Sequence, residues 1–310
     1  MTDADVGGVP GTASSARPRV HAFVISWSGY ADKAAAIATA LEAEVDQLTV
    51  IHSEPGVVNR HRPGKWVVVP DSHFYGMKFR RSLELFAGDV MLQIQADADC
   101  ADWRLVVEKT KLAFASVPRL GVWAPDVSFT PLPLWLVSLA DDPTGLRHVA
   151  LVDGVVWALS ADVCGRLRQF DYTTNNVGWG IDWAAAAFAH ATGRPVMVDP
   201  SLAVSHPMTR GYSTDAAEPQ MERFLTGLLP TEQAMRGLIQ AKLAPKRSDR
   251  PLRDGVRQIG RDLRHRARII VDGLRGRVPQ PTRPVPAPEL YEAEETASDA
   301  ESTRSKPLSA

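Results

Sequence analysis

Several features that would narrow the protein class are scarce in this sequence. Its 310 residues include only two cysteines, Cys100 and Cys164, which excludes a disulfide framework or a cysteine-rich zinc site and suits a reducing cytosol. No apolar run is long enough to span a membrane, and the N-terminal segment lacks the apolar core of a signal peptide. The formal net charge is −1, so the overall charge favours neither nucleic acid nor membranes. We therefore expect a globular protein, without a nucleic-acid partner.

The two ends of the chain differ in composition from its middle. Residues 1–19 are rich in Gly, Pro, Ser, Thr and Ala, and residues 278–310 in Pro, Glu, Ser and Thr, so both predict disordered tails. Residues 231–277 are predicted to form a basic helical extension, in which positions 252–274 carry one apolar stripe surrounded by arginines. The stripe packs either on the folded domain or on an anionic membrane surface. Residues 20–230 are predicted to form the folded domain.

This domain alternates short apolar runs with helical patterns. The runs VHAFVISW, QLTVIHS, KWVVVPD and VMLQIQAD predict four buried strands, and the segments between the first two and the last two predict helices. The alternation predicts an α/β sheet, largely parallel and flanked by helices. Residues 104–165 predict a helix followed by strands around proline-broken turns.

Acidic residues follow the fourth predicted strand. Asp97 and Asp99 form a D-x-D motif at the sheet edge beyond which ligands bind in open α/β sheets. In the turn after a strand, both carboxylates can converge on a hard cation such as Mg²⁺ or Mn²⁺, which prefers oxygen ligands and leaves room for substrate phosphates. The same motif is also compatible with a solvated acidic turn. Asp102 precedes Trp103 and is expected to cap a helix.

Two blocks of the sequence resemble family 2 glycosyltransferases, which have the GT-A fold and use nucleotide-sugar donors. The block YGMKFRRSLELFAGDVMLQIQADAD resembles the helix, turn and D-x-D strand end of that family. The block NNVGWGIDWAAAAFAHATGRPVMVDPSLAVSHPMTRGY resembles the segment in which an acidic residue opens a helix after a Gly/aromatic turn, followed by a strand and V-x-H-P. Their order and spacing match the family, and the resemblance covers roughly residues 20–225.

The resemblance implies a role for each acidic residue. Asp97 would contact the ribose or the metal, Asp99 would bind the cation that bridges the donor diphosphate, and His206 would be the other metal-side ligand. Asp182 would be the general base for the acceptor hydroxyl. Sugar transfer requires a neutralised leaving group and an activated oxygen, and free N–H groups at a helix N-terminus hold a carboxylate in place. The structural alternatives are a helix cap for Asp182 and a packed histidine for His206.

Further positions match the places where the family cradles the nucleotide. Ser26, Trp27 and Ser53 follow the first two strands. Asp71 ends the third strand and would accept a hydrogen bond from the nucleotide's base. The side chains that would reach phosphate, or else lie on a solvated surface, are Lys78, Arg80, Arg81 and Arg210. Arg210 lies in a segment that would close over the donor. The segment Gly178–Gly180 departs from the commoner acidic pair, which leaves acceptor recognition open, and Trp179 would stack on a sugar ring.

Together these patterns predict a cytoplasmic glycosyltransferase of the hexosyltransferase type, peripheral at the inner membrane face if the basic helix binds lipid. It would be inverting, would depend on Mg²⁺ or Mn²⁺, and would act on a glycan or lipid-linked acceptor in polysaccharide biosynthesis. The alternative is a non-catalytic nucleotide-sugar-binding or scaffold protein of the same fold. A phosphotransfer site of the haloacid-dehalogenase type is disfavoured because the first strand carries no Asp nucleophile.

Overall fold

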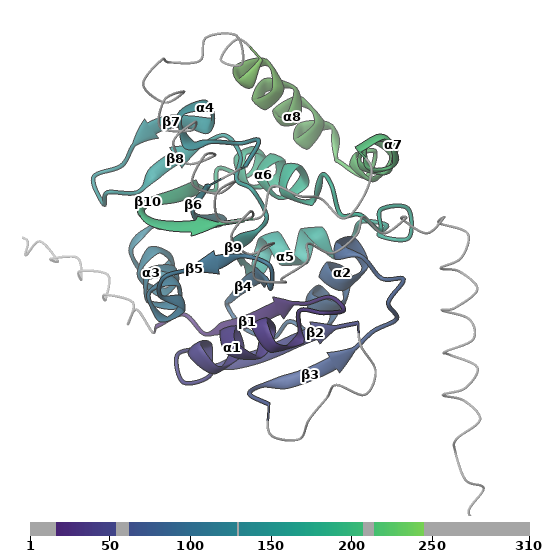
Figure 1. Cartoon of the computed structure of the whole chain (residues 1–310). Coiled ribbons are helices and arrows are strands. Elements are labelled where there is room, and N and C mark those ends of the chain that lie inside the picture. Colours follow the sequence, from purple (N-terminus) through teal and green to yellow (C-terminus); the bar gives the residue numbers. More distant parts are fainter. Residues whose placement is uncertain (1–16, 54–61, 129, 207–213, 245–310) are drawn as a thin grey trace, which may run out of the picture.

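One central sheet runs through the described part of the chain (Figure 1). The computed structural model describes residues 17–53, 62–128, 130–206 and 214–244. Within these residues the strand order is β3-β2-β1-β4-β9-β6-β10-β8-β7, and β5 pairs with β10. The strands are β1 (Val20–Ile25), β2 (Gln47–His52), β3 (Lys65–Val68), β4 (Val90–Gln95), β5 (Asp99–Cys100), β6 (Val122–Ser128), β7 (Ser138–Asp141), β8 (Arg147–Val149), β9 (Val156–Ser160) and β10 (Val196–Ser205). The helices are α1 (Ala31–Leu41), α2 (Tyr75–Leu85), α3 (Trp103–Ser116), α4 (Leu134–Val137), α5 (Ala161–Leu167), α6 (Ile181–Ala191), α7 (Thr214–Leu225) and α8 (Pro230–Leu243).

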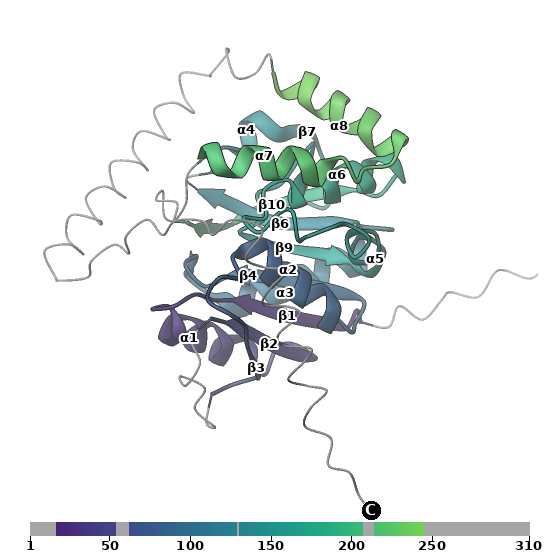
Figure 2. The same cartoon turned by 90° about the vertical axis from the view of Figure 1, so that its right-hand side faces the viewer.

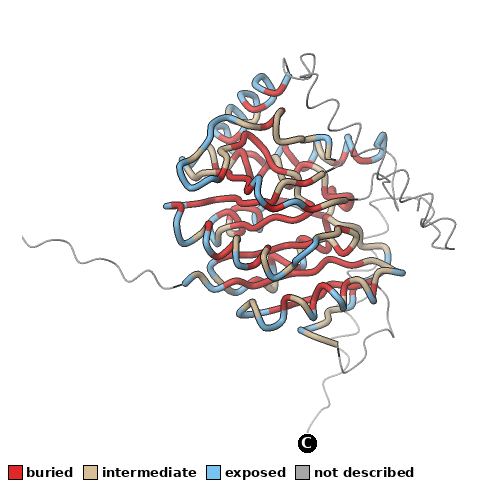
Figure 3. Tube along the Cα trace, turned by 60° about the vertical axis from the view of Figure 1, so that its left-hand side comes forward, coloured by how far each residue is buried: buried red, intermediate tan, exposed pale blue. Residues whose placement is uncertain are grey.

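The first four strands form the parallel part of the sheet. β1 lies between β2 and β4 and pairs with both in parallel, and β3 extends the sheet beyond β2. All six residues of β1 are buried, because helices cover both faces (Figure 3). Since side chains alternate along a strand, Phe23 and Ile25 pack with α2, α5 and α6, whereas Ala22 and Val24 pack with α1 and α3. The expected α/β fold with helices flanking the sheet is confirmed.

The second half of the sheet is mixed rather than parallel. β9 runs antiparallel to both β4 and β6, whereas β10 is parallel to β6. The segment between β6 and β9 contains the short helix α4 and the antiparallel pair β7–β8, which reverses the chain before β9 begins. The prediction of a largely parallel sheet therefore describes the β3-β2-β1-β4 part, and the proline-broken pattern of residues 104–165 did not reveal the direction of β9.

Helix α8 extends the folded body beyond residue 230, where the sequence analysis placed the end of the domain. It packs against α6, and its Ile239 and Leu243 are buried in the same core (Figure 2). Its Glu232 forms a buried two-bond ion pair with Arg166 of α5, with both N···O distances at 2.7 Å. Helix α8 is therefore anchored by charge as well as by apolar contact. The apolar stripe at 252–274 lies outside the described residues. The same holds for residues 1–16 of the predicted N-terminal tail and for the predicted C-terminal tail from residue 278.

Two further expectations can be compared with the fold. Both cysteines are free thiols, as the low cysteine count predicts, and Cys164 is buried. None of the helices in the described part of the chain is both long and apolar enough to cross a membrane.

Candidate active site

The pairing of two strands brings the D-x-D motif to His206. Asp97 follows β4, and Asp99 opens β5, where it lies opposite Ser205 at the end of β10. The next residue, His206, thereby places its Nε2 3.3 Å from Oδ2 of Asp97. Asp97 and His206 thus meet at the carboxyl edge of β4, where α/β sheets bind ligands, and Asp99 follows them in β5.

Asp97 and His206 form a mostly enclosed carboxyl–imidazole pair. Their side chains are 20% and 21% exposed. Burial by itself lowers the pKa of His206, but the hydrogen bond and the charge of Asp97 outweigh it and raise that pKa above its usual value. The second oxygen of Asp97, Oδ1, is buried and accepts no hydrogen bond. A buried acceptor without a donor costs free energy unless a cation or donor answers it, so this oxygen fits a cation ligand.

Asp99 already has a cationic neighbour, which the sequence analysis did not anticipate. Lys33 of α1 places its Nζ 2.9 Å from Oδ1 of Asp99 and also donates a hydrogen bond of 2.8 Å to the backbone oxygen of Asp97. Among the residues that the structure describes, no three His, Cys, Asp or Glu side chains are arranged closely enough to hold a metal ion. Asp97, Asp99 and His206 have the donor atoms for Mg²⁺ or Mn²⁺, but Asp99 would first have to leave Lys33.

Asp182 lies in the first turn of α6, as the sequence predicted. Gly180, immediately before the helix, has a φ of 87°, which only glycine adopts readily and which starts the helix at this point. Oδ1 of Asp182 accepts a hydrogen bond of 2.9 Å from the backbone N–H of Trp183. Burial, reinforced by the negative charge of Asp153, raises the pKa of Asp182 to about 7. The carboxyl group is therefore poised to exchange a proton near neutral pH.

The loop before α6 is positioned by close packing against the start of α2. Gly76 N donates to the backbone oxygen of Asn176 at 2.8 Å, and Phe74 N donates to its side-chain oxygen at 2.9 Å. A Cβ on Gly76 would lie 1.9 Å from the backbone oxygen of Asn175, and a Cβ on Gly178 would lie 2.4 Å from the ring of Tyr75. Both positions thus require glycine. The two sequence blocks that carry the family resemblance are in contact here, which sets where Asp182 begins its helix.

Asp153 is a site residue that the sequence analysis missed. It lies between β8 and β9, accepts a hydrogen bond from the Thr130 hydroxyl, and acts electrostatically on both Asp182 and His206. It also lines a small hollow together with Asp126 and apolar side chains from α4, β6 and β10. The local signal was the Asp-Gly turn after the apolar run VALV, but that pattern is common in loops.

The predicted nucleotide cradle is held together by a buried lysine. Lys78 of α2 is fully buried, and its Nζ donates to the backbone oxygen of Ser26 at 2.7 Å and to Oγ of Ser53 at 2.5 Å. It also lies 5.1 Å from the ring centre of Trp27. In this arrangement Lys78 ties the ends of β1 and β2 together, and a contact from Lys78 to phosphate stays a prediction.

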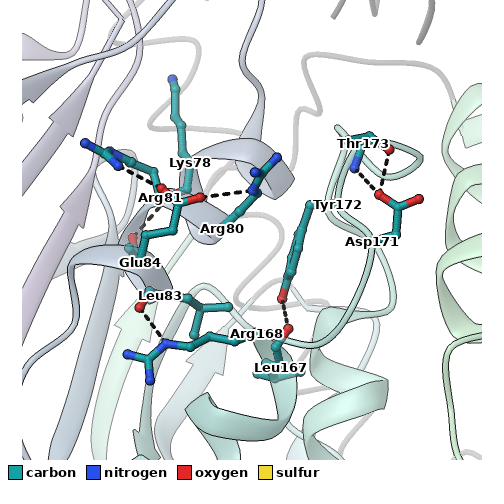
Figure 4. A network of polar contacts seen from close by, with 11 residues as sticks. Lys78, Arg80, Arg81, Leu83, Glu84, Leu167, Arg168, Asp171, Tyr172 and Thr173 are labelled. Carbon is teal, nitrogen blue, oxygen red and sulfur yellow. Dashed lines mark hydrogen bonds and ion pairs between the residues drawn. The ribbon is translucent and has the colours of Figure 1, made fainter. Parts of the chain in front are cut away.

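The remaining predicted donor contacts are dispersed. Arg80 and Arg81 pair with Glu84 on their own helix, at 3.0 Å and 2.7 Å, and extend away from Lys78 (Figure 4). Asp71 is exposed in the turn after β3, three residues beyond the end of that strand. Arg210 lies outside the described residues. Asp102, by contrast, caps α3 as expected, because its side chain accepts hydrogen bonds from the N–H groups of Arg104 and Leu105.

Comparisons with known proteins bear on the fold of this chain. No protein-family model and no curated protein matches the chain. Among solved structures, TarS 1–349 of S. aureus matches 72% of this chain and 70% of its own, at 11% identity and a TM-score of 0.50.

Two further matches have lower TM-scores. Glucosyl-3-phosphoglycerate synthase from Mycobacterium tuberculosis, solved with Mn²⁺, UDP-glucose and phosphoglyceric acid, matches 73% of this chain and 86% of its own at 16% identity and a TM-score of 0.48. GalNAc-T7, solved with UDP, GalNAc and Mn²⁺, matches 66% of this chain at 10% identity and a TM-score of 0.46, and the match spans only 47% of GalNAc-T7. The fold of this chain is GT-A-like, as the sequence resemblance predicted.

Proposed function

We propose that this protein transfers a sugar from a nucleotide-diphosphate donor to an acceptor hydroxyl, with inversion at the anomeric carbon. The observation that carries the proposal is the pair of acidic sites at one edge of a GT-A-like sheet. One site holds Asp97 next to His206, and the other holds Asp182 with a pKa of about 7. Inverting transfer needs one site for a leaving diphosphate and another for a proton, and the two acidic sites would provide them.

The D-x-D side would hold the donor. Asp97, Asp99 and His206 are the residues proposed to bind Mg²⁺ or Mn²⁺, which when bound neutralises charge on the leaving diphosphate. Ser26, Ser53 and Trp27 lie at the ends of β1 and β2, where the nucleotide would rest, and Lys78 holds that cradle in shape. Mn²⁺ in the solved structures of glucosyl-3-phosphoglycerate synthase and GalNAc-T7 is consistent with this assignment.

The Asp182 side would activate the acceptor. As the acceptor oxygen bonds to the anomeric carbon, its proton passes to the carboxylate of Asp182, and the bond from that carbon to the diphosphate oxygen breaks. A base with a pKa near the working pH combines a useful ionised fraction with sufficient basicity. The neighbouring hollow, with the carboxylates of Asp126 and Asp153, would accept hydrogen bonds from sugar hydroxyls of a glycan or lipid-linked acceptor.

The cellular setting is also part of the proposal. We propose a cytoplasmic hexosyltransferase acting in polysaccharide biosynthesis. The residues that would bring it to the inner membrane face, at 252–274, lie outside the described part of the chain, so a peripheral association with anionic lipid stays a prediction from the apolar stripe and its arginines.

A thermal-shift screen would test the proposal. A panel of UDP- and GDP-sugars is added with Mn²⁺ or with EDTA, and a donor should raise the melting temperature only with Mn²⁺ because ligand binding stabilises the native state. Each stabilising donor is then incubated with candidate glycan acceptors, and release of free nucleoside diphosphate is measured. Stabilisation without turnover on any acceptor would favour the non-catalytic alternative, and no stabilisation by any nucleotide-sugar would contradict both.

A further inference from the structure

Lys33 lies inside the proposed donor site and has no role assigned to it so far. It stands in the first turn of α1, a helix that starts beside the D-x-D motif. Burial, followed by the charges of Asp97 and Asp99, raises the pKa of Tyr30, the residue before that helix. Lys33 reaches Asp99 through its carboxylate and Asp97 through its backbone oxygen, at 2.9 Å and 2.8 Å. An ammonium group therefore already contacts the carboxylate of Asp99 that is proposed to bind the metal.

We infer that Lys33 is a displaceable counter-ion of Asp99, which competes with the divalent cation for that carboxylate and then contacts the donor diphosphate. The inference deepens the proposed function and rests on it. It makes Lys33 a positioning residue of the donor site. In the metal-free protein it neutralises Asp99, and in the loaded protein it supplies a second positive charge to the leaving group.

The exposure of the pair argues that Lys33 can be displaced. The side chains of Lys33 and Asp99 are 34% and 45% exposed, and ion pairs at such positions contribute little to stability because water screens them. A divalent cation carries twice the charge of an ammonium group and binds several oxygens at once, so it should win this competition. The long flexible stem of lysine allows the ammonium group to move without a change in the backbone.

The neighbouring oxygen argues against Lys33 as a permanent replacement for the metal. Oδ1 of Asp97 is buried and accepts no hydrogen bond, although Lys33 lies beside the same residue. If Lys33 had taken over the whole role of a cation here, its ammonium group would be expected to satisfy the carboxylate of Asp97 as well as that of Asp99. Instead it bonds to the backbone oxygen of Asp97, which leaves this carboxylate and His206 available to a metal.

The test is calorimetric titration of the full chain with Mn²⁺ alone, followed by titration with UDP at saturating Mn²⁺. The variants are Lys33→Met, which removes the charge, and Lys33→Gln, which removes the charge but can still donate to the backbone oxygen of Asp97. The matched control is Lys109→Met. Lys109 has a similarly exposed side chain, 31%, and faces Asp199 at 3.7 Å, outside the proposed site.

Both Lys33 variants should bind Mn²⁺ roughly two- to fivefold more tightly than wild type, the range expected when a partly exposed competing charge is removed. Both should then bind UDP more weakly at saturating Mn²⁺ by a similar factor, because a diphosphate contact is lost. Lys109→Met should match wild type in both titrations. Use of two substitutions keeps the test valid if Lys33→Met folds poorly.

Unchanged or weaker Mn²⁺ binding in both Lys33 variants would overturn the inference, as would unchanged UDP binding. Failure of every protein, wild type included, to bind Mn²⁺ would also overturn it. In that last case the proposed function is judged separately. Stabilisation by a nucleotide-sugar in EDTA would leave sugar transfer standing, whereas no stabilisation under any condition would remove it too.

Discussion

The two acidic regions of the site contain the same side chain in opposite electrostatic settings. The cation-side acids, Asp97 and Asp99, each have a positive partner, His206 or Lys33. The base-side acids, Asp153 and Asp182, accept hydrogen bonds from neutral donors, the Thr130 hydroxyl for Asp153 and backbone N–H groups such as that of Trp183 for Asp182. The cation-side acids thus lie beside basic side chains, whereas burial and the charge of Asp153 raise the pKa of Asp182 to about 7.

The difference follows from where each acid enters the fold. Asp97 and Asp99 lie in the turn from β4 to β5, where α1 approaches on one side and the end of β10 on the other, and both neighbours contribute a cationic side chain. Asp182 lies in the first turn of α6, directly after the closely packed loop 175–180, and its charged neighbour is Asp153. Carboxylates beside exchangeable basic partners suit a metal ion, whereas a half-buried carboxyl beside another acid suits proton transfer.

The substitution Asp182→Asn should give the largest effect, since it removes the base while keeping the shape of the side chain. We expect turnover to fall roughly 10²- to 10⁴-fold, the usual contribution of a general base. Affinity for the nucleotide donor should stay within about twofold of wild type, because the proton acceptor meets the acceptor and not the diphosphate. Rates would be measured by nucleotide release and affinity by calorimetry. A variant that loses donor affinity and unfolds early would make Asp182 a helix cap.

The substitution Asp99→Asn tests the cation side. It removes one charged ligand, and we expect Mn²⁺ affinity to fall by at least roughly 10- to 100-fold, since the loss of a residue that only supports a metal ligand already costs that much. The matched control is Asp102→Asn, which changes an acid three positions away but keeps a residue suited to capping α3. The measurement is a Mn²⁺ titration of both variants. Equal losses in the two would show that acidity of the segment, and not Asp99, is what matters.

The pH dependence of kcat/KM should report the ionisation of Asp182. Asp182 accepts a proton only when ionised, and its pKa is about 7. At saturating Mn²⁺, kcat/KM should therefore increase about tenfold per pH unit as the pH is raised from 5 towards 7. Above pH 7 it should stay constant. The measurement is a profile from pH 5 to 9, with the residual rate of Asp182→Asn as the control. A flat profile, or a shoulder that persists in the variant, would assign the titration to another group.

The smallest expected effect is on stability. The folded-state pKa of Asp182 is raised from 3.8 to about 7, so its ionisation destabilises the folded protein. The cost is absent below about pH 4, grows as the pH rises towards 7, and is constant above. Asp182→Asn should therefore raise Tm at pH 8 by roughly 2–8 °C, for a gain of about 1–2 kcal/mol once partial exposure is allowed for. Calorimetry at pH 4 and pH 8 would check it, and an equal shift at both values would contradict the assignment.

Much of this protein could be predicted from short stretches of its sequence. Short, nearly continuous apolar runs predicted β1, β2 and β4, because a strand that is buried on both faces needs apolar side chains on both. The capping role of Asp102 and the place of Asp182 at a helix start could also be predicted, since both depend on residues within one helical turn. The resemblance to GT-A glycosyltransferases linked these local signals into one fold.

The tertiary structure alone decided which distant residues meet. His206 reaches Asp97 because β5 pairs with β10, and Lys33 reaches Asp99 because α1 starts beside the same turn. Lys78, a surface position by its charge, is buried because the ends of β1 and β2 offer it oxygen acceptors. Local pattern reports which face of an element is apolar, but ion pairs and pKa shifts depend on distances between elements, and these are set only when the whole sheet is assembled.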